Sequence, residues 1–308
     1  MKLGCVCWLF DDTALGHGPP YEDEIRAVGE LGFEGTELIL ETPDDLKNYW
    51  SQKRIDDLNR LCKSYKLTVS EFVVYQEMVG GLASLDPFSK EQALEFWEIG
   101  CKMAVQFDAE VVNMVSPWPA GMTSPNYYLP FYFYYYGKGV QKIEPKFKLK
   151  LPEDFDWNAY WENYIDSVSQ CLDIAKGHGL RFAIENHSNV MSGYVDSLLR
   201  VFDRIPDPAL GANLDMRWAY TNREDVPWSI YKLGKEKLFS THCGDGDGLA
   251  GYMLPVGMGT LDWEGIMRAL IEVDYQGFFT FEWGGYADPI RYAKEALAFT
   301  RDLIARIS

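Results

Sequence analysis

The fold is decided by two neighbouring stretches of this chain, THCGDGDG at residues 241–248 and VGMGTLDWEGIMRALIEVDYQGFFTFEWGG at residues 256–285. The sequence LFSTH predicts a short buried strand that ends on His242, because the Gly/Asp run behind it cannot continue a strand. FFTFE predicts a second strand, which ends on Glu282. Between them, apolar residues recur at helical spacing after Asp262, a candidate N-cap. The order strand, helix, strand indicates one unit of a parallel sheet.

Two strands upstream end in the same way. Glu185 closes LRFAIE and Asp215 closes LGANLD, so four consecutive predicted strands finish on Glu, Asp, His and Glu. In a (β/α)8 barrel the carboxyl ends of neighbouring strands converge on the face that carries the chemistry. Three carboxylates and one imidazole make an oxygen-rich site suited to a divalent cation.

The rest of the chain fits eight strand-helix units, so we expect an α/β protein with a single (β/α)8 TIM barrel domain over residues 1–308. The length of 308 residues is normal for one barrel, and no linker divides the chain. The predicted strands are 2–10, 32–40, 67–75, 109–117, 180–187, 205–215, 238–242 and 278–282. The predicted helices are 21–31, 52–65, 90–107, 158–175, 195–202, 228–235, 263–271 and 290–307.

Residues 117–156 depart from this repeat, because prolines interrupt them and Phe131 to Tyr136 form a run of six aromatic residues. The segment follows the carboxyl end of the fourth strand, so we expect an aromatic-rich insertion on the catalytic face. Two interpretations stay open for it. The aromatic residues cover the barrel or an oligomer interface, or they stack on a substrate.

Composition excludes several classes of function. A net charge of −17 opposes binding to nucleic acid, whose affinity comes largely from Lys and Arg. No apolar run approaches the roughly 20 residues that span a bilayer. The first residues are too short and too badly flanked for a secretory signal. The six cysteines form no CxxC pair, so we expect reduced thiols and a cytoplasmic location.

The chain resembles the xylose isomerase-like family of barrel enzymes, the sugar phosphate isomerase/epimerase superfamily. The likeness is carried by GMGTLDWEGIMRALIEVDYQGFFTFEW at residues 257–283 and by a His-x-x-Asp pattern at His242 and Asp245. It implies one divalent ion, Mn²⁺ or Mg²⁺ with Co²⁺ or Zn²⁺ as alternatives, and a glutamate acid/base pair formed by Glu185 and Glu282. The metal ligands that it implies are Glu185, Asp215, His242 and Glu282.

The chain also departs from the sugar epimerases of that family. Trp218 stands where they have a second histidine, and GDGDG after His242 lacks the arginine that they carry there. His187 lies two residues beyond Glu185, so in an extended segment both side chains point to one face. We expect His187 to be a catalytic acid/base or a substrate contact, the alternative being a loop residue with no chemical role. Only four histidines are present, too few for the histidine-rich centre of the related endonucleases.

The predicted function is a metal-dependent sugar isomerase or epimerase that transfers a proton next to a carbonyl through an enediolate, using Glu185, Glu282 and His187. The alternative is a lyase that performs β-elimination on a 3-oxo-sugar or inosose, resembling the C-glycoside deglycosidases or the dehydratases. A non-catalytic scaffold subunit is a third reading. The expected partners are a sugar, polyol or glycoside substrate and, in the assembly, further copies of the chain or a small second subunit.

Overall fold

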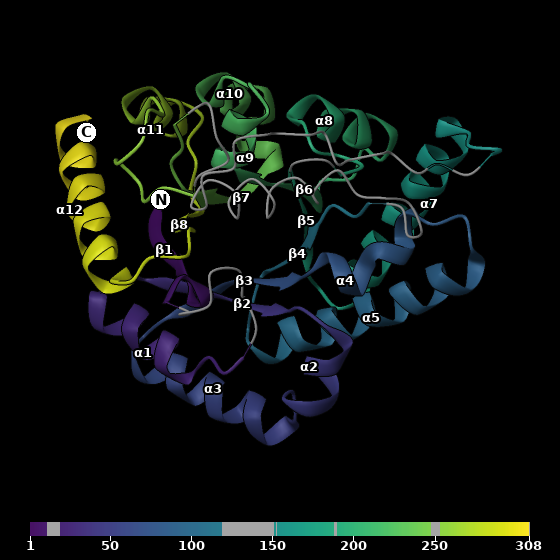
Figure 1. Ribbon diagram of the computed structural model, residues 1–308, viewed down its shortest axis with the longest axis horizontal. Coiled ribbons are helices and arrows are strands. Elements are labelled where there is room, and N and C mark those ends of the chain that lie inside the picture. Colours follow the sequence, from purple (N-terminus) through teal and green to yellow (C-terminus); the bar gives the residue numbers. More distant parts are fainter. Residues whose placement is uncertain (11–18, 119–150, 152, 188–189, 248–252, 308) are drawn as a thin grey trace, which may run out of the picture.

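A computed structural model describes residues 1–10, 19–118, 151, 153–187, 190–247 and 253–307, and within them eight parallel strands close into one barrel in chain order (Figure 1). The strands are β1 (Lys2–Val6), β2 (Gly35–Leu40), β3 (Thr68–Val74), β4 (Val111–Val115), β5 (Arg181–Glu185), β6 (Leu210–Asp215), β7 (Leu238–Cys243) and β8 (Phe278–Phe281). The predicted (β/α)8 barrel is therefore confirmed.

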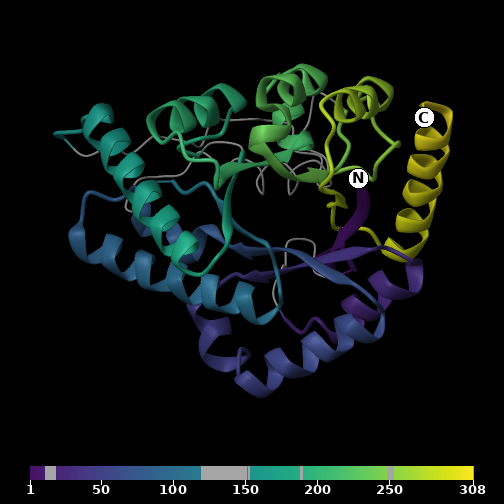
Figure 2. The same ribbon diagram turned by 180° about the vertical axis from the view of Figure 1, so that it is seen from behind.

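Helices form a ring around the strands, and a hydrophobic core lies between the two layers (Figures 1 and 2). The α-helices are α1 (Glu22–Leu31), α2 (Pro43–Asn48), α3 (Gln52–Ser64), α4 (Gln76–Val79), α5 (Pro87–Gln106), α7 (Trp157–Gly177), α8 (Val195–Arg204), α9 (Met216–Thr221), α10 (Val226–Lys237), α11 (Trp263–Glu272) and α12 (Pro289–Ile307). Two short 3₁₀ helices, η1 (Cys7–Phe10) and η2 (Gly80–Ala83), accompany them.

The barrel closes where the first strand meets the last. β1 pairs with β8 in parallel, with Leu3 opposite Phe279 and Cys5 opposite Phe281. α12 then packs beside α1 and α11, so the last helix lies next to the first one (Figure 2). This closure leaves no unpaired sheet edge and brings all strand ends into one ring.

Side-chain caps explain where several helices begin. The carboxylate of Asp262 accepts a hydrogen bond from the backbone N–H of Gly265, which confirms the predicted N-cap of α11. Asp86 caps α5 in the same way, and Pro87 follows it at the first helical position, so this helix starts three residues before the predicted Lys90. Beyond the other end of α7, Gly179 adopts a positive φ of 77°, a conformation that favours glycine.

Three expectations about the elements need correction. The first strand ends at Val6, because residues Cys7–Phe10 turn into η1. The second strand, predicted over residues 32–40, starts only at Gly35, so Glu37 lies within β2. The short helices α2, α4 and α9 were not predicted, since each has too few residues to display a helical period. The predicted aromatic insertion falls mostly on residues 119–150 and 152, which lie outside the described residues.

Two further features concern the chain as a whole. The six cysteines are in the described part of the chain, where each is buried and unpaired. Among the helices of the described residues, none combines the length and the apolar character needed to cross a membrane.

Candidate metal centre

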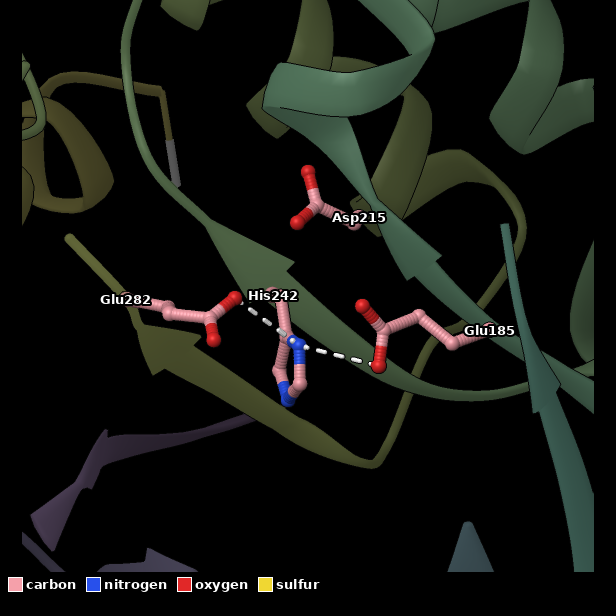
Figure 3. A group of neighbouring side chains, drawn as sticks. All are labelled: Glu185, Asp215, His242 and Glu282. Atoms are coloured by element: carbon pink, nitrogen blue, oxygen red, sulfur yellow. Dashed lines mark ion pairs between the residues drawn. The ribbon is translucent and has the colours of Figure 1, made fainter. Parts of the chain in front are cut away.

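Four side chains meet at the carboxyl end of the barrel, and they are the four that the sequence singled out (Figure 3). Each offers one ligand atom, and these atoms all lie within 4.8 Å of one another. The four residues are Glu185, Asp215, His242 and Glu282. Glu185 and Asp215 are the last residues of β5 and β6, His242 is the last but one of β7, and Glu282 directly follows β8.

Strand register explains why they converge. Asp215 lies opposite His242 across the β6–β7 pair, and His242 lies opposite Thr280 across the β7–β8 pair. Because neighbouring strands are parallel and in this register, strand ends far apart in the sequence reach the same level of the barrel. The predicted convergence of four strand ends is present in the structure.

His242 lies at the centre of the group. Its Nδ1 is 3.0 Å from Oε2 of Glu282 and 3.5 Å from Oε2 of Glu185, and Figure 3 shows the two carboxylates on either side of the ring. Within the described part of the chain, this buried Nδ1 has no hydrogen-bond partner of good geometry. Such an atom, surrounded by carboxylate oxygens, is suited to binding a cation.

Two of the carboxylates are held by side chains from other strands or helices. Asn113 of β4 donates from Nδ2 to Oε2 of Glu185 at 3.0 Å. Trp8 of η1 donates from its indole N–H to Oε1 of Glu282 at 3.2 Å. Hydrogen bonds of this kind fix the orientation of metal-ligating groups before the metal arrives.

Asp215 is held by its own loop. Its carboxylate Oδ1 accepts a hydrogen bond from the backbone N–H of Trp218 at 2.6 Å, so Asp215 is also the N-cap of α9. The side chain of Asn186 accepts from the backbone N–H of Asp215 and donates to its carbonyl. With Oδ1 engaged in this way, Oδ2 is the oxygen left for a cation.

Burial of so many acidic groups shifts their protonation. Burial raises the pKa of Asp215 to about 8, and Glu282 and Glu185 add to this while Arg217 opposes it. Burial by itself would lower the pKa of His242, but the carboxylates of Glu282, Glu37 and Glu185 outweigh it and raise that pKa well above its usual range. A divalent cation between these groups would favour ionised carboxylates and a neutral imidazole instead. The donor set therefore fits a hard divalent ion.

His187 lies in the loop just after β5 and is half-buried. Its ring contacts the ring of Trp218, with 4.2 Å between the centroids. It belongs to neither of the ligand groups found among the described residues, Glu185–Asp215–His242–Glu282 and Glu37–Glu71–His242. Its assignment as an acid/base or substrate contact stays a prediction.

Trp218 also contacts the positively charged side chain of Arg217, a residue that was not predicted from the sequence. The guanidinium of Arg217 lies 3.7 Å from the centroid of the Trp218 ring, and its Nη2 is 4.0 Å from Oδ2 of Asp215. Arg217 is buried, and its Nη1 has no hydrogen-bond partner within the described residues. The chain thus has an arginine beside the centre, although it comes from α9, which directly follows β6, and not from the loop after His242.

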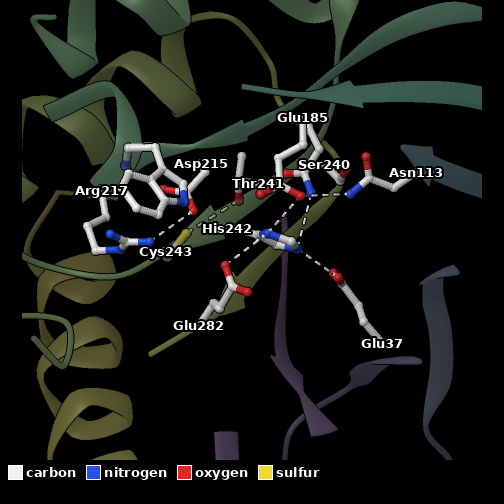
Figure 4. Close-up of polar contacts among 12 residues, drawn as sticks. Glu37, Asn113, Glu185, Asp215, Arg217, Ser240, Thr241, His242, Cys243 and Glu282 are labelled. Atoms are coloured by element: carbon white, nitrogen blue, oxygen red, sulfur yellow. Dashed lines mark hydrogen bonds and ion pairs between the residues drawn. The ribbon is translucent and has the colours of Figure 1, made fainter. Parts of the chain in front are cut away.

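A second polar layer adjoins the centre on the Nε2 side of His242, where Figure 4 shows Glu37. Glu37 of β2 contacts Nε2 of His242 at 2.8 Å. Asn213 of β6 and Ser240 of β7 donate hydrogen bonds to the carboxylate of Glu71 in β3. All four are buried, and burial followed by the charge of Glu37 raises the pKa of Glu71 well above its usual range.

This layer was largely overlooked in the sequence, although a signal for it was present. Each of these three strands has a carboxylate or amide side chain beside apolar residues, namely Glu37 in GTELIL, Glu71 in SEFVV and Asn213 in GANLD. Alternation places such a residue on the inner face of a barrel strand.

Asp245, the last residue of the His-x-x-Asp pattern, has a structural role and does not point into the cluster as a ligand. Its carboxylate accepts hydrogen bonds from the backbone N–H groups of Gly246, Gly257 and Leu261 and from the indole N–H of Trp263. It is completely buried and joins the loop after β7 to the turn before α11. Asp245 therefore stabilises the turn and is not one of the four clustered side chains.

The fold and the cluster therefore define the class of this protein: a (β/α)8 barrel with a candidate divalent-metal centre at the carboxyl end of its strands. The family model described as xylose isomerase-like TIM barrel matches residues 25–303, and this chain belongs to that family. A curated relative is the fructoselysine 3-epimerase of Escherichia coli O157:H7, 23% identical over 297 residues that cover 92% of this chain and 94% of the relative.

Solved structures agree on the fold. The D-psicose 3-epimerase from Clostridium cellulolyticum H10, solved with D-tagatose, superposes with a TM-score of 0.74 at 18% identity, covering 99% of both chains. The 3-keto-D-glucoside 4-epimerase from E. coli superposes with a TM-score of 0.71 at 17% identity, covering 98% of this chain and 99% of the other.

Proposed function

We propose that this protein is a divalent-metal-dependent sugar epimerase or isomerase. The observation that supports this most strongly is the convergence of Glu185, Asp215, His242 and Glu282 at the carboxyl end of a barrel of this family. The epimerase activities of the relatives agree with an enzyme of the isomerase class.

The metal centre supports proton transfer next to a carbonyl. A divalent cation held by the four side chains would withdraw electron density from the carbonyl and hydroxyl oxygens of a sugar and so acidify the adjacent C–H. Mn²⁺ or Mg²⁺ suits the oxygen-rich donor set best, because thiolates are absent from it.

Glu185 and Glu282 then supply the acid/base pair. Their carboxylates approach His242 from opposite sides (Figure 3), so one can remove a proton from one face of the carbon and the other can return a proton to the opposite face. Asn113 and Trp8 keep the two carboxylates oriented during this exchange. Return of the proton to the opposite face inverts the carbon and produces an epimer.

His187 is proposed as a further acid/base or substrate contact. The chain has Trp218 at the position of the second histidine of the epimerases, and the indole supports the imidazole of His187 from the neighbouring loop. An unperturbed imidazole titrates near pH 6.5 and suits proton transfer at neutral pH. Arg217 adds a buried positive charge beside Asp215 that would attract an oxygen atom of the substrate.

The lyase alternative uses the same first step, since loss of a proton next to a carbonyl also permits β-elimination. The relatives give it no specific support, and we keep it as an outcome of the test.

We also propose a cytoplasmic location, where the six buried thiols stay reduced. In addition, we propose an oligomer of this chain or of this chain with a small second subunit.

The test is solvent exchange. Mn²⁺-loaded protein is incubated in D₂O with a panel of ketoses, inososes and 3-oxo-glucosides, and the products are followed by NMR and mass spectrometry. We expect deuterium at the carbon beside the carbonyl together with an epimer or isomer, and we expect Glu185→Gln and Glu282→Gln to stop both. Release of a leaving group would assign the lyase reaction instead, and activity that appears only with a second polypeptide would identify a hetero-oligomer.

The surface variant Glu264→Gln is the matched control, because Glu264 is exposed and pairs with Arg268 on its own helix. Absence of exchange with every member of the panel, from protein that has bound Mn²⁺, would contradict the proposed function.

A further inference from the structure

We propose that Glu37 is a positioning residue that keeps the proton of His242 on Nε2, so that Nδ1 faces the centre as an unprotonated ligand. This inference rests on the proposed function, because it concerns how the metal centre is prepared. It concerns a residue of β2, a strand that contributes none of the four clustered side chains.

The two nitrogens of His242 face two different layers of the barrel (Figure 4). Nδ1 faces Glu282 and Glu185 at 3.0 and 3.5 Å. Nε2 faces Glu37, whose Oε2 is 2.8 Å away. A carboxylate can only accept a hydrogen bond, so this contact requires a proton on Nε2.

The amide of Asn213 also contacts Nε2 of His242, but this contact does not determine the tautomer. Its Nδ2 is 3.1 Å from Nε2 of His242 and 2.9 Å from Oε1 of Glu71. An amide NH₂ group can only donate, so it would favour an unprotonated Nε2, whose lone pair would then face the carboxylate of Glu37. One N–H of the Asn213 amide donates to Glu71, and Oδ1 of Asn213 has no hydrogen-bond partner within the described residues, so the contact with Asn213 does not by itself set the protonation of Nε2.

The alternative orientation of the Asn213 amide is worse. A flip would place its carbonyl oxygen against the carboxylate of Glu71 and leave Glu71 without one of its two donors. The amide therefore stays as a donor to Glu71, and the shorter contact from Glu37 decides the tautomer of His242.

Glu37 is held firmly enough for this role. It is completely buried in the middle of β2, with Val6 and Glu71 as its partners in the neighbouring strands. Within the described part of the chain, its Oε1 has no hydrogen-bond partner, so the hydrogen bonding of this carboxylate is directed at His242. A carboxylate on the far nitrogen fixes the ring of a ligating histidine and makes the other nitrogen a better donor to a metal.

The first experiment measures Mn²⁺ binding to the full chain by titration with EPR detection of free Mn²⁺. We expect Glu37→Gln to bind Mn²⁺ about 10- to 100-fold more weakly than the wild type, the usual effect of removing such a partner. Glu71→Gln is the matched control, because it makes the same substitution in the same buried layer, with Oε1 of Glu71 at 3.9 Å from Nε2. We expect Glu71→Gln to change the affinity by less than about threefold.

The second experiment reads the tautomer directly and needs no variant at Glu37. Two-bond ¹H–¹⁵N correlations of the Mg²⁺-loaded wild type are recorded, and His242 is identified by its absence in His242→Gln. We expect a protonated Nε2 and an unprotonated Nδ1. This result establishes which nitrogen carries the proton, and the weaker Mn²⁺ binding of Glu37→Gln ties that tautomer to Glu37.

Each outcome decides the inference. Equal losses in Glu37→Gln and Glu71→Gln, or a protonated Nδ1 in the Mg²⁺-loaded protein, would overturn the role of Glu37 and leave the metal centre standing. A wild-type protein that binds neither ion would overturn the metal centre and this inference together.

Discussion

At the scale of single residues, each of the three clustered carboxylates accepts a hydrogen bond from a neighbouring residue. Trp8 holds Glu282, Asn113 holds Glu185, and the backbone N–H of Trp218 holds Asp215. These contacts set the direction of each donor before a cation is present, which lowers the reorganisation that binding requires. The centre is therefore expected to respond to the loss of one ligand more strongly than to changes on the surface.

The first prediction concerns metal content. Glu282→Gln and His242→Ala should both lose most of the bound Mn²⁺ or Mg²⁺, because each removes one of only four donor side chains. Elemental analysis of freshly purified protein measures this, with Glu264→Gln as the surface control. Unchanged metal content in both variants would exclude these residues as ligands.

The second prediction concerns His187. His187→Ala should keep its metal and its stability but lose turnover by about 10²-fold or more, a typical contribution of a general acid or base. Trp218→Phe serves as the comparison, since it retains an aromatic ring against His187 and should lose less. If His187→Ala turns over a verified substrate at the wild-type rate, proton transfer depends on Glu185 and Glu282 alone.

At the scale of elements, the loop after β7 is joined to the start of α11 by Asp245. One buried carboxylate accepts from three backbone N–H groups and one indole N–H, and the turn between the two elements is organised around it. This arrangement holds the end of β7, and with it His242, three residues away. In the His-x-x-Asp pattern, Asp245 therefore stabilises the fold, whereas His242 belongs to the clustered side chains.

The third prediction compares the stability contributed by Asp245 with that contributed by Asp262, the N-cap of α11. Asp245→Ala should lower the free energy of unfolding by about 3 kcal/mol, because it leaves buried donors such as the Leu261 N–H and the Trp263 indole without an acceptor. Asp262→Ala, which removes only the N-cap of α11, should cost about 1 kcal/mol. Urea denaturation of both variants compares them, and equal losses would contradict the role given to Asp245.

At the scale of the whole molecule, the barrel gathers five carboxylates around one imidazole, and all of them except the partly exposed Glu282 are buried. Glu37 and Glu71 form the inner layer, and Glu185, Asp215 and Glu282 form the layer at the mouth. The buried acidic groups oppose ionisation of one another, as the raised pKa values of Asp215 and Glu71 indicate. A bound cation would relieve this repulsion and stabilise the folded barrel.

The fourth prediction is the thermal consequence. Mn²⁺ at 100 times its dissociation constant should stabilise the native state by about 2.7 kcal/mol, provided that it does not bind the unfolded chain. For a chain of this size, that corresponds to a rise in Tm of roughly 5 °C. Differential scanning calorimetry with Mn²⁺ and then with excess EDTA measures it, and a Tm that neither addition changes would argue against a metal centre inside the barrel.

Much of the fold and of the centre could be predicted from local patterns. Buried strands and amphipathic helices are visible in short windows of sequence, and Glu185, Asp215 and Glu282 each come at the end of an apolar strand where the pattern breaks. The short helices α2, α4 and α9 gave no such signal, because one or two turns cannot display a period.

The sequence by itself therefore determined the order of the strands and the donors at the ends of four of them, since the parallel barrel brings such ends together without further information. The tertiary structure alone decided which inner residue meets which ligand. Glu37 reaches His242 across 205 positions of sequence, and Arg217 comes to lie beside Asp215. These contacts depend on the register between strands and on the closure of β1 against β8, which the pattern within a single strand does not contain.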